Sequence, residues 1–509
     1  MTIKTVAQVC AAHGLEAPGL VTARIGGASL PASAEAETMQ VLYPATEEPV
    51  TRVQEAGPAE VDAAVAAARA SFESGVWSQM PVSRRQAVMR QVTHQVATHR
   101  DELAVLESLC AGLPCNHLVD RQVPRAAENF SFFADYIGHL AGETFEQMDG
   151  YLTAVTREPA GVAALLAPWN APLALASMQI ASCIAFGNSC VVKPSEHTPW
   201  SVLRLVELME EAGVPAGVIN VVNGRGPVTG QALVAHPGID RIAFTGGTAT
   251  ARGIMAAAAP NLTPVHFELG GKSANIVFDD ADLEAALDGS LVNIFSNSGQ
   301  ICIAGSRILV QRRIAEPFIE RFVARTAQLR IGDPSERATE IGPLAFAGHR
   351  DRVLEYFRLA RDEGAEILAG GGAAEGFERG YFVQPTVARV ADNRLRVCQE
   401  EVFGPFATIQ VFDDVEQAIA IANDSAYGLV AYAWTGRLAL AMELQQRIRA
   451  GTLWINTPLA RDLRAPFGGF KDSGIGRDGP RQCADFYTEE KASIVPRGPV
   501  TIRKMGMEP

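Results

Sequence analysis

A cysteine in a loop of mostly small and polar residues is the first candidate for chemistry in this sequence. Cys302 stands in the stretch SNSGQICIAGSR, residues 296–307, which offers no aromatic side chain to shield its thiol. A thiolate is a strong nucleophile when neighbouring groups lower the pKa of the thiol. Free cysteines are more often buried and inert, so further chemical groups must support a nucleophile here.

Two other side chains could complete a catalytic centre. Glu268 precedes a Leu-Gly-Gly-Lys joint, and Asn170 lies in PWNAP, residues 168–172, just after an apolar run. A thiol, a carboxylate and an amide can supply a nucleophile, a general base and a donor to an oxyanion. The three residue types together indicate nucleophilic catalysis.

Glycine turns that could hold phosphate follow two of the expected strands. The segment Gly224-Arg-Gly226-Pro-Val-Thr-Gly230 is one residue longer than the usual dinucleotide fingerprint, and alone it also fits a plain turn. A second turn, FTGGT at 244–248, ends a neighbouring strand. Two such turns at the carboxyl ends of neighbouring strands favour a bound dinucleotide.

A lysine and a glutamate end another expected strand. Lys193 and Glu196, in KPSE, could each hold a ribose hydroxyl, and the glutamate would repel a 2′-phosphate. The pair therefore favours NAD over NADP. The alternative is an exposed turn with two solvated charges.

The elements that must position these residues alternate between short apolar runs and helices. Strands are expected at 161–167, 189–194, 218–224 and 241–247, with helices at 59–72 and 198–212. This alternation predicts a parallel sheet covered on both faces, as in dinucleotide-binding domains. A second set, including SANIVF, RILVQ, AEILAGG, YFVQPTVARV, FATIQVF and TLWIN, predicts a second α/β domain, with the boundary near 268–272.

Length and composition limit the classes of protein that fit. At 509 residues, with 48% hydrophobic and 20% charged residues, the chain suits a soluble protein of more than one domain. A net charge of −13 argues against a nucleic-acid or membrane-surface partner. The charge-free stretch 159–192 is interrupted by Pro168, Asn170 and Pro172, so it predicts a strand, a turn and a helix rather than a membrane span.

The cysteines predict a reducing compartment. Eight of them occur with no C-x-x-C pair and no cysteine/histidine cluster at zinc spacing. We therefore expect reduced thiols in a cytoplasmic protein and no metal site. The N-terminal MTIKTVAQVC has no apolar core of signal-peptide type, which agrees with that expectation.

Taken together, these stretches resemble the aldehyde dehydrogenase superfamily over nearly the whole chain. The matching text is APWNAP, VVKPSEHTP, FTGGT, FELGGKS, GQIC, EEVFGP and PFGGFKDSGIGR, in the family's order. The resemblance implies NAD-dependent oxidation of an aldehyde to a carboxylic acid through a cysteine thiohemiacetal and a thioester. A small-molecule aldehyde is then the expected partner.

The resemblance also assigns roles to residues. Cys302 is expected to be the nucleophile, Glu268 the general base, and Asn170, with the backbone N–H of Cys302, the oxyanion site. Lys193 and Glu196 are expected to contact the adenosine ribose. The remaining expected cofactor contacts are Trp169, Gly226, Gly230, Thr245, Gly246, Glu401 and Phe403.

Three positions depart from the family's pattern. Gly247 stands where the family often has a serine that can touch a phosphate. Gln179 and Asp478 stand where the family often has a lysine and a glutamate that relay protons from the base. We therefore expect the route by which protons leave Glu268 to differ here.

The substrate is indicated by the run TPLARDLRAPFGG, residues 457–469. It resembles the RDLR-x-PFGG text of muconic semialdehyde dehydrogenases, with the whole chain closest to the 5-carboxymethyl-2-hydroxymuconic type. Guanidinium groups bind carboxylates bidentately, so Arg461 and Arg464 predict an acidic semialdehyde. The alternative is that either arginine pairs with Asp462 or a surface carboxylate. Other expected pocket residues are Arg121, Met178, Ile301 and Ile303.

The expected architecture is α/β, with a Rossmann-like NAD-binding domain, a catalytic domain and a small β oligomerisation arm. The NAD-binding domain is placed at 1–137 and 160–268, the catalytic domain at 269–475, and the arm at 138–159 and 488–509. Segments 150–157 and 492–495 alternate like exposed strands, which tend to pair between subunits. A homodimer or homotetramer is therefore expected.

Three other functions remain alternatives. One is a general, aromatic or aliphatic aldehyde dehydrogenase. Another is an acylating enzyme that passes the thioester to coenzyme A, although such enzymes usually lack the glutamate seen at 268. The third is a catalytically silent structural relative, against which the presence of both Cys302 and Glu268 argues.

Overall fold

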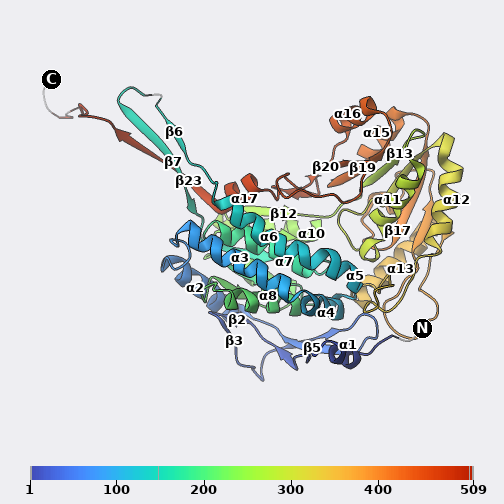
Figure 1. Cartoon of the computed structure of the whole chain (residues 1–509), viewed down its shortest axis with the longest axis horizontal. Coiled ribbons are helices and arrows are strands. Elements are labelled where there is room, and N and C mark those ends of the chain that lie inside the picture. The colour runs from blue at the N-terminus through green and yellow to red at the C-terminus, as the bar shows by residue number, and fades with distance from the viewer. Residues whose placement is uncertain (1–2, 147, 504, 507–509) are drawn as a thin grey trace.

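Two α/β bodies and one projecting sheet make up the molecule (Figure 1). The computed structural model describes residues 3–146, 148–503 and 505–506. The ranges expected for the NAD-binding domain and the arm also contain residues 1–2, 147, 504 and 507–509, which lie outside the described residues. The C-terminal segment runs along the projecting sheet, whereas the N-terminal segment lies far from it, below the second body in the view of Figure 1.

The first body is built on an eight-stranded sheet. In hydrogen-bonded order its strands are β22 (Gly474–Ile475), β12 (Val265–Glu268), β11 (Arg241–Thr245), β8 (Val162–Leu166), β9 (Ser189–Lys193), β10 (Ile219–Val221), β2 (Arg24–Ile25) and β3 (Ala28–Ser29). The five strands from β12 to β10 are parallel, while β22, β2 and β3 pair antiparallel. This confirms the parallel sheet expected from the alternating apolar runs.

Helices cover both faces of this sheet because its strands are apolar on both sides. In β8, Ala163 and Leu165 belong to one buried cluster, and Val162, Ala164 and Leu166 belong to another. The first cluster includes α3 (Val82–Thr98), α6 (Val123–Ile137), α7 (Pro172–Ala185) and α8 (Trp200–Glu211). The second includes α2 (Pro58–Glu73), α9 (Gln231–Val234) and α10 (Thr248–Ala258).

The charge-free stretch 159–192 forms β8, a turn and α7, as expected from its prolines and asparagine. Helix α7 has 14 residues, and almost all of them are buried inside the first body. Among the described residues, no helix is both long and apolar enough to cross a membrane.

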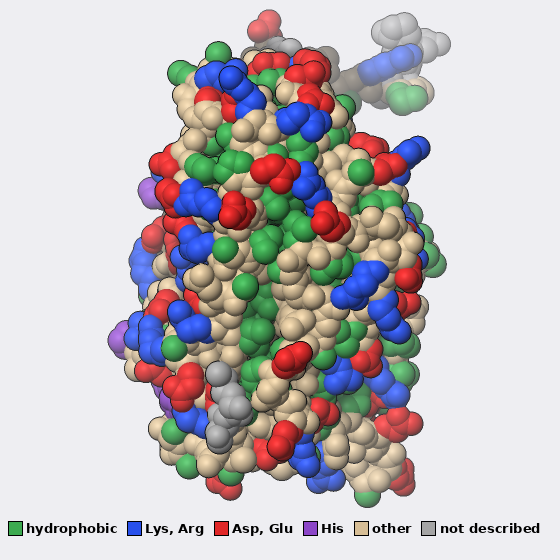
Figure 2. Space-filling model, turned by 90° about the vertical axis from the view of Figure 1, so that its right-hand side faces the viewer, with side chains coloured by type: hydrophobic (Ala, Val, Ile, Leu, Met, Phe, Trp, Pro, Cys, Tyr) green, Lys and Arg blue, Asp and Glu red, His purple; other side chains and the backbone are tan. Residues whose placement is uncertain are grey.

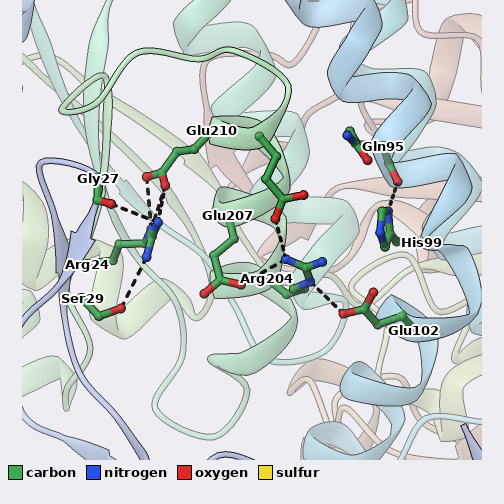
Figure 3. Close-up of polar contacts among 10 residues, drawn as sticks. Arg24, Gly27, Ser29, Gln95, His99, Glu102, Arg204, Glu207 and Glu210 are labelled. Carbon is green, nitrogen blue, oxygen red and sulfur yellow. Dashed lines mark hydrogen bonds and ion pairs between the residues drawn. The ribbon is translucent and has the colours of Figure 1, made fainter. Parts of the chain in front are cut away.

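Ion pairs fasten α8 to its neighbours at the surface (Figure 3). Arg24 of the β2–β3 hairpin pairs with Glu210, and Arg204 Nε lies 2.7 Å from Glu102 Oε1 of α4 (Arg100–Ala111). Pairs at this level of exposure contribute about 0–1 kcal/mol each. They therefore orient the outer helix, while apolar packing holds it.

A second, seven-stranded sheet forms the other body. Its order is β15 (Glu366–Ala369), β16 (Thr386–Arg389), β17 (Phe406–Phe412), β14 (Arg307–Gln311), β13 (Ala274–Val277), β19 (Val430–Trp434) and β20 (Thr452–Ile455). Only the edge strand β15 pairs antiparallel. The covering helices are α11 (Leu283–Phe295), α12 (Ala315–Thr326), α13 (Ala347–Asp362), α14 (Arg396–Gln399), α15 (Val415–Asn423) and α16 (Leu438–Arg447).

The surface at the outer end of this second body carries charges of both signs as well as hydrophobic side chains. Figure 2 shows Lys and Arg side chains interspersed with Asp and Glu, on either side of a band of hydrophobic side chains. No single sign of charge dominates the face that this view presents.

The chain crosses between the two bodies twice. It first passes from β12 to β13 over residues 269–273, where the sequence places the domain boundary. It later returns as β22, whose Ile475 and Gly474 pair antiparallel with Phe267 and Glu268 of β12. The strand that carries Glu268 is therefore bonded to the returning segment.

The projecting sheet has three antiparallel strands. They are β6 (Glu143–Phe145), β7 (Tyr151–Pro159) and β23 (Thr488–Pro496), with β7 in the centre. The register between β7 and β23 runs from Thr488 opposite Pro159 to Pro496 opposite Tyr151. The two exposed segments read from the sequence thus pair with each other.

Short elements complete the fold. They are α1 (Val6–Ala12), β1 (Leu20–Val21), β4 (Thr38–Leu42), β5 (Pro49–Gln54), α5 (Cys115–His117), η1 (Leu118–Gln122), η2 (Gly226–Gly230), η3 (Ala259–Asn261), η4 (Ser296–Gly299), η5 (Arg312–Ile314), β18 (Tyr427–Gly428), β21 (Phe470–Lys471) and α17 (Pro480–Tyr487).

Candidate active site

A cavity of about 270 Å³ lies at the carboxyl ends of the first sheet's strands, facing the second body. In doubly wound sheets this edge is where ligands bind. Eight residues singled out in the sequence line the cavity: Trp169, Asn170, Thr245, Gly246, Glu268, Cys302, Glu401 and Phe403. Sequence reasoning missed four further side chains of the lining, namely Leu175, Phe346, His349 and Arg352.

The backbone before Cys302 has an unusual conformation. Asn297, Ser298 and Gly299 all have positive φ values of 56°, 54° and 73°. Left-handed backbone costs free energy in residues other than glycine and persists where the surroundings fix it. Here Ser298 Oγ donates a hydrogen bond to the carbonyl of Gly342 at 2.9 Å. This bond fixes the loop to the segment that contains Gly342.

Two asparagines join the cysteine loop to the first body. Asn170 Nδ2 donates to the carbonyl of Gln300 at 2.9 Å, and Asn297 Nδ2 donates to the carbonyl of Asn170 at 2.8 Å. Because both side chains are buried, the two bonds fix the amide of Asn170 beside Cys302. The role of Asn297 was missed, although Asn-Ser-Gly is a run whose residues tolerate positive φ.

The thiol of Cys302 is protonated at rest. Burial raises its pKa to about 12, the negative charges of Glu401 and Glu268 add to the rise, and Arg125 opposes it. A thiol in this state needs a base, or a cationic group brought in with a ligand, before it can attack.

Glu268 has the properties of a general base. It is buried at the end of β12, and neither carboxylate oxygen has a hydrogen-bond partner. Burial raises its pKa to about 7, and the neighbouring imidazole of His266 opposes the rise. A carboxyl group that titrates near neutral pH can both accept and release a proton.

His266 lies beside Glu268 and was also missed. Side chains two residues apart on a strand share a face, so VHFE already places His266 and Glu268 together. Nε2 of His266 is 3.5 Å from Glu268 Oε1 and 3.7 Å from Asp478 Oδ1. Gln179 donates instead to the carbonyl of Leu166 and to Thr245 Oγ1, at 3.3 and 3.2 Å.

A second group of predicted residues lies at the end of β9, outside the lining of the main cavity. Lys193 Nζ is 3.7 Å from Glu196 Oε2. A Cβ on Gly230 would lie 3.6 Å from the stem of Lys193, while one on Gly226 would meet no atom within 4 Å. The backbone at Gly226 is therefore open to a ligand, as a phosphate contact requires.

Glu401 and Phe403 shape the wall nearest Cys302. Glu401 Oε1 accepts the N–H of Gly271 at 3.0 Å, and burial raises the pKa of this carboxyl to about 7. A Cβ on Gly270 would collide with the same carboxylate. Phe403, with φ 58°, packs edge-on against Trp169 at 5.2 Å between ring centroids.

Two partly buried arginines, Arg125 and Arg461, act electrostatically on Cys302 and Glu268 respectively. Arg461 stands over the ring of Phe467 at 4.6 Å, and the Nε atoms of Arg461 and Arg125 are both buried without a hydrogen-bond partner. Burial and then the charge of Arg461 lower the pKa of Arg125 to about 9. Neither arginine makes an ion pair with any described acidic residue.

Apolar residues surround these charges. Met178 is buried on α7, while Ile301 and Ile303 flank Cys302 and are partly buried. Ile303 and Cys302 pack against the same small cluster, which includes Tyr432 and Trp454. Ile301 and Ile303 are thus adjacent to the thiol, whereas Met178 belongs to the core cluster of the first body.

Two predicted substrate residues are not brought to this centre, which corrects the sequence interpretation. The side chain of Arg464 is 80% exposed and pairs with Asp462 at 2.6 Å, because the two-residue spacing closes a tight local turn. Arg121 is exposed on η1 and lines a separate cavity of about 630 Å³. Arg125 lies four residues later, about one helical turn along the chain. Its Nε atom is buried, and its charge acts on Cys302.

Comparison with known proteins agrees with this geometry. The aldehyde dehydrogenase family profile matches residues 31–493. The chain is 42% identical to the 2-hydroxymuconic semialdehyde dehydrogenase of Pseudomonas sp. (strain CF600), over 90% of this chain and 96% of that protein. It is also 42% identical to the 5-carboxymethyl-2-hydroxymuconate semialdehyde dehydrogenase of Escherichia coli, over 86% and 93%.

A solved structure extends the likeness to three dimensions. The NAD+ complex of an aldehyde dehydrogenase from Bacillus cereus superposes with a TM-score of 0.92 at 38% identity, covering 97% of this chain and 100% of that one. Fold, family profile and relatives agree over nearly the full length. The chain therefore belongs to the aldehyde dehydrogenase family.

Proposed function

We propose that this enzyme oxidises an aldehyde bearing a remote carboxylate, of the hydroxymuconic semialdehyde type, to the corresponding acid with NAD. The observation that carries the proposal is the pair Arg125 and Arg461, whose Nε atoms are buried without a hydrogen-bond partner and which form no ion pair with a described acidic residue. Buried charges are normally paired, so an anionic ligand is the missing partner. The two relatives named for hydroxymuconic semialdehydes support the same class of substrate.

The residues present suit NAD. Gly226 leaves its backbone open to a phosphate, and Lys193 and Glu196 could offer a donor and an acceptor to ribose hydroxyls. Glu196 would repel a 2′-phosphate, which favours NAD over NADP. Glu401 and Phe403 would bound the reactive end beside Cys302. When bound, the cofactor supplies a hydride acceptor.

In the proposed acylation, Glu268 takes the thiol proton and Cys302 Sγ forms a bond to the aldehyde carbon. The resulting oxyanion accepts hydrogen bonds from Asn170 Nδ2 and the backbone N–H of Cys302. One such donor is typically worth about 3–4 kcal/mol in the transition state. Loss of hydride from the thiohemiacetal carbon then leaves a thioester on Cys302.

Hydrolysis of the thioester uses the same base. Glu268 accepts a proton from water while the water oxygen bonds to the thioester carbon, and collapse of the adduct expels the thiolate of Cys302, which regains its proton from Glu268. The free oxygens of Glu268 and its pKa of about 7 support this role. A base in this position favours release of a free acid over transfer to coenzyme A.

Substitution of Arg461 tests the substrate proposal. Hydrogen bonds to charged groups contribute about 1.5–3 kcal/mol, so Arg461→Ala should lower kcat/KM roughly ten- to hundredfold for 2-hydroxymuconic semialdehyde. Hexanal has no carboxylate and should be affected little. Arg464→Ala is the matched control, because its exposed side chain is already paired with Asp462.

Equal losses on both aldehydes in Arg461→Ala would contradict an acidic substrate and favour a general aldehyde dehydrogenase. A selective loss in Arg464→Ala rather than in Arg461→Ala would mean that the loop rearranges to bring Arg464 inward, as the sequence alone suggests.

We also propose that the enzyme works in the cytoplasm as a homodimer or homotetramer assembled through the projecting sheet. All eight cysteines are unpaired, which suits a reducing compartment. The sheet exposes Phe145, Ile494 and Val495, apolar side chains that a second subunit could cover.

A further inference from the structure

The surroundings of His266 give this residue a defined task. Its side chain is only 7% exposed, and the ring of Phe486 packs edge-on against it at 5.4 Å. A Cβ on Gly476 would lie 3.2 Å from the imidazole, so glycine is what allows β22 to approach. The ring is enclosed on these sides and presents Nε2 to two carboxylates.

The two carboxylates differ in their access to solvent. The side chain of Glu268 is 10% exposed, and that of Asp478 is 17% exposed. Nε2 lies within 3.7 Å of an oxygen of each, and it has no hydrogen-bond partner at closer range. Backbone bonds between Phe467 and Asp478 fix the second carboxylate in place. The histidine therefore bridges the inner acid and the outer one.

We propose that His266 relays protons from Glu268 to Asp478 and so returns the base to its active form. This inference rests on the proposed function and completes its proton balance. Neutral His266 accepts the proton of Glu268 at Nε2, which leaves a carboxylate and an imidazolium. Asp478 then takes the proton from Nε2 and releases it to solvent.

The balance of protons makes such a route necessary. Glu268 receives one proton from the thiol of Cys302 and another from water, and it holds only one at a time. It must discharge between the two steps. Gln179 has no titratable group, and its amide is bonded to Leu166 and Thr245.

The charges that face the imidazole suit the transfer. Burial lowers the pKa of His266, but Glu268 and Asp478 outweigh it, so the pKa lies above its ordinary value despite Arg477. Arg461 acts on Glu268 from the opposite side. Burial raises the pKa of Glu268 to about 7, so this carboxyl group can release a proton to the imidazole at neutral pH.

The test is His266→Ala, assayed with and without added imidazole. Rapid mixing with NAD and 2-hydroxymuconic semialdehyde should give a burst of reduced cofactor of wild-type amplitude. Steady turnover should then be roughly ten- to hundredfold slower, within the range of a lost acid–base group. Mass spectrometry of the quenched enzyme should show the acyl group accumulating on Cys302.

Added imidazole should restore turnover in His266→Ala, because it fits the space left by the ring and can carry the proton. His236→Ala is the matched control: this histidine also faces a carboxylate, Asp62 at 3.2 Å, but lies outside the site. It should show wild-type kinetics and no response to imidazole.

The outcomes separate the relay from other roles. Unchanged steady turnover in His266→Ala would overturn the relay while leaving the proposed function standing. A slow variant that imidazole does not rescue would make His266 structural. Failure of the wild-type enzyme to reduce NAD with this aldehyde would refute the proposed function itself.

A metal role is tested in the same samples, because His266, Glu268 and Asp478 each offer a ligand atom within 4.8 Å of the others. Purified wild-type enzyme that contains a stoichiometric divalent ion, and loses activity with chelator, would overturn the relay.

Discussion

At Glu268, the surroundings convert an ordinary carboxyl group into a base suited to neutral pH. The pKa rises from 4.5 to about 7 because burial disfavours the charged form. Glu401 reaches a similar value for the same reason, but the N–H of Gly271 occupies one of its oxygens. The free oxygens of Glu268 distinguish the proposed base from its neighbour.

This pKa gives a prediction for activity. Below pH 7, Glu268 is increasingly protonated and cannot accept a proton, so kcat should fall about tenfold per pH unit on the acid side. In His266→Ala this acid-side fall in kcat should begin at a higher pH, because the contact from His266 lowers the pKa of Glu268. Steady-state rates between pH 5 and 9, measured for the wild-type enzyme and for His266→Ala, show where kcat begins to fall in each. A wild-type fall that begins only below pH 5.5 would contradict the assignment.

Residue types and spacing anticipated the cavity lining better than the substrate arginines. Cys302, Glu268 and Asn170 lie in motifs whose glycine, proline and strand signals also fix the backbone. Arg461 and Arg464 share one irregular loop, where no periodicity tells which side chain turns inward. Arg125 was missed because a charged residue on an amphipathic helix ordinarily faces solvent.

At the scale of elements, the loop before Cys302 depends on one glycine. Gly299 has φ 73°, and a Cβ there would collide with the carbonyl of Gly404 and lie 2.6 Å from Pro405 N. The segment just before that carbonyl carries Glu401 and Phe403. One close contact thus positions the nucleophile loop and the proposed cofactor wall together.

Gly299→Ala should therefore damage both stability and catalysis. Left-handed alanine costs about 1–2 kcal/mol, and overpacking against backbone adds roughly 1–3 kcal/mol. Gly364→Ala is the control: its φ is 84°, but a Cβ there meets no atom within 4 Å. Urea unfolding and kcat report the difference. Equal effects of the two substitutions would mean that the collision relaxes without consequence.

Strands with clear turn signals were anticipated, and others were not. Strands β8, β9, β11 and β17 are short runs rich in apolar residues, and glycine, proline or a charged residue follows each of them closely. Strand β19, VAYAW, lies between β13 and the edge strand β20 and was not singled out, although all its residues are buried. Alanine contributes little strand propensity, so tertiary packing decides its conformation.

For the whole molecule, the projecting sheet predicts how copies associate. Ile494→Lys with Val495→Lys should shift the enzyme to a smaller oligomer, because each buried lysine would need a partner that an apolar interface lacks. Leu438→Lys is the control, since Leu438 is 77% exposed on α16, far from the sheet. Sedimentation velocity distinguishes the species. An unchanged mass for the double variant would place the interface elsewhere.

The domain bounds expected from the sequence stay a prediction. The two segments that connect the sheets show why a boundary was easier to recognise at one connection than at the other. The first connection coincides with the Gly270–Gly271 joint, which composition marks clearly. The returning strand β22 has only two residues, too few for periodicity to reveal, and it exists because β12 offers an edge.

That return has a mechanical consequence. A single glycine joint would tie the two bodies at one point, whereas the returning strand is hydrogen-bonded to the strand that precedes the joint. Glu268 ends that strand, so its carboxylate is held where both connections pass. A strain between the two bodies would therefore displace this base less than it would displace a residue on a connection with a single strand.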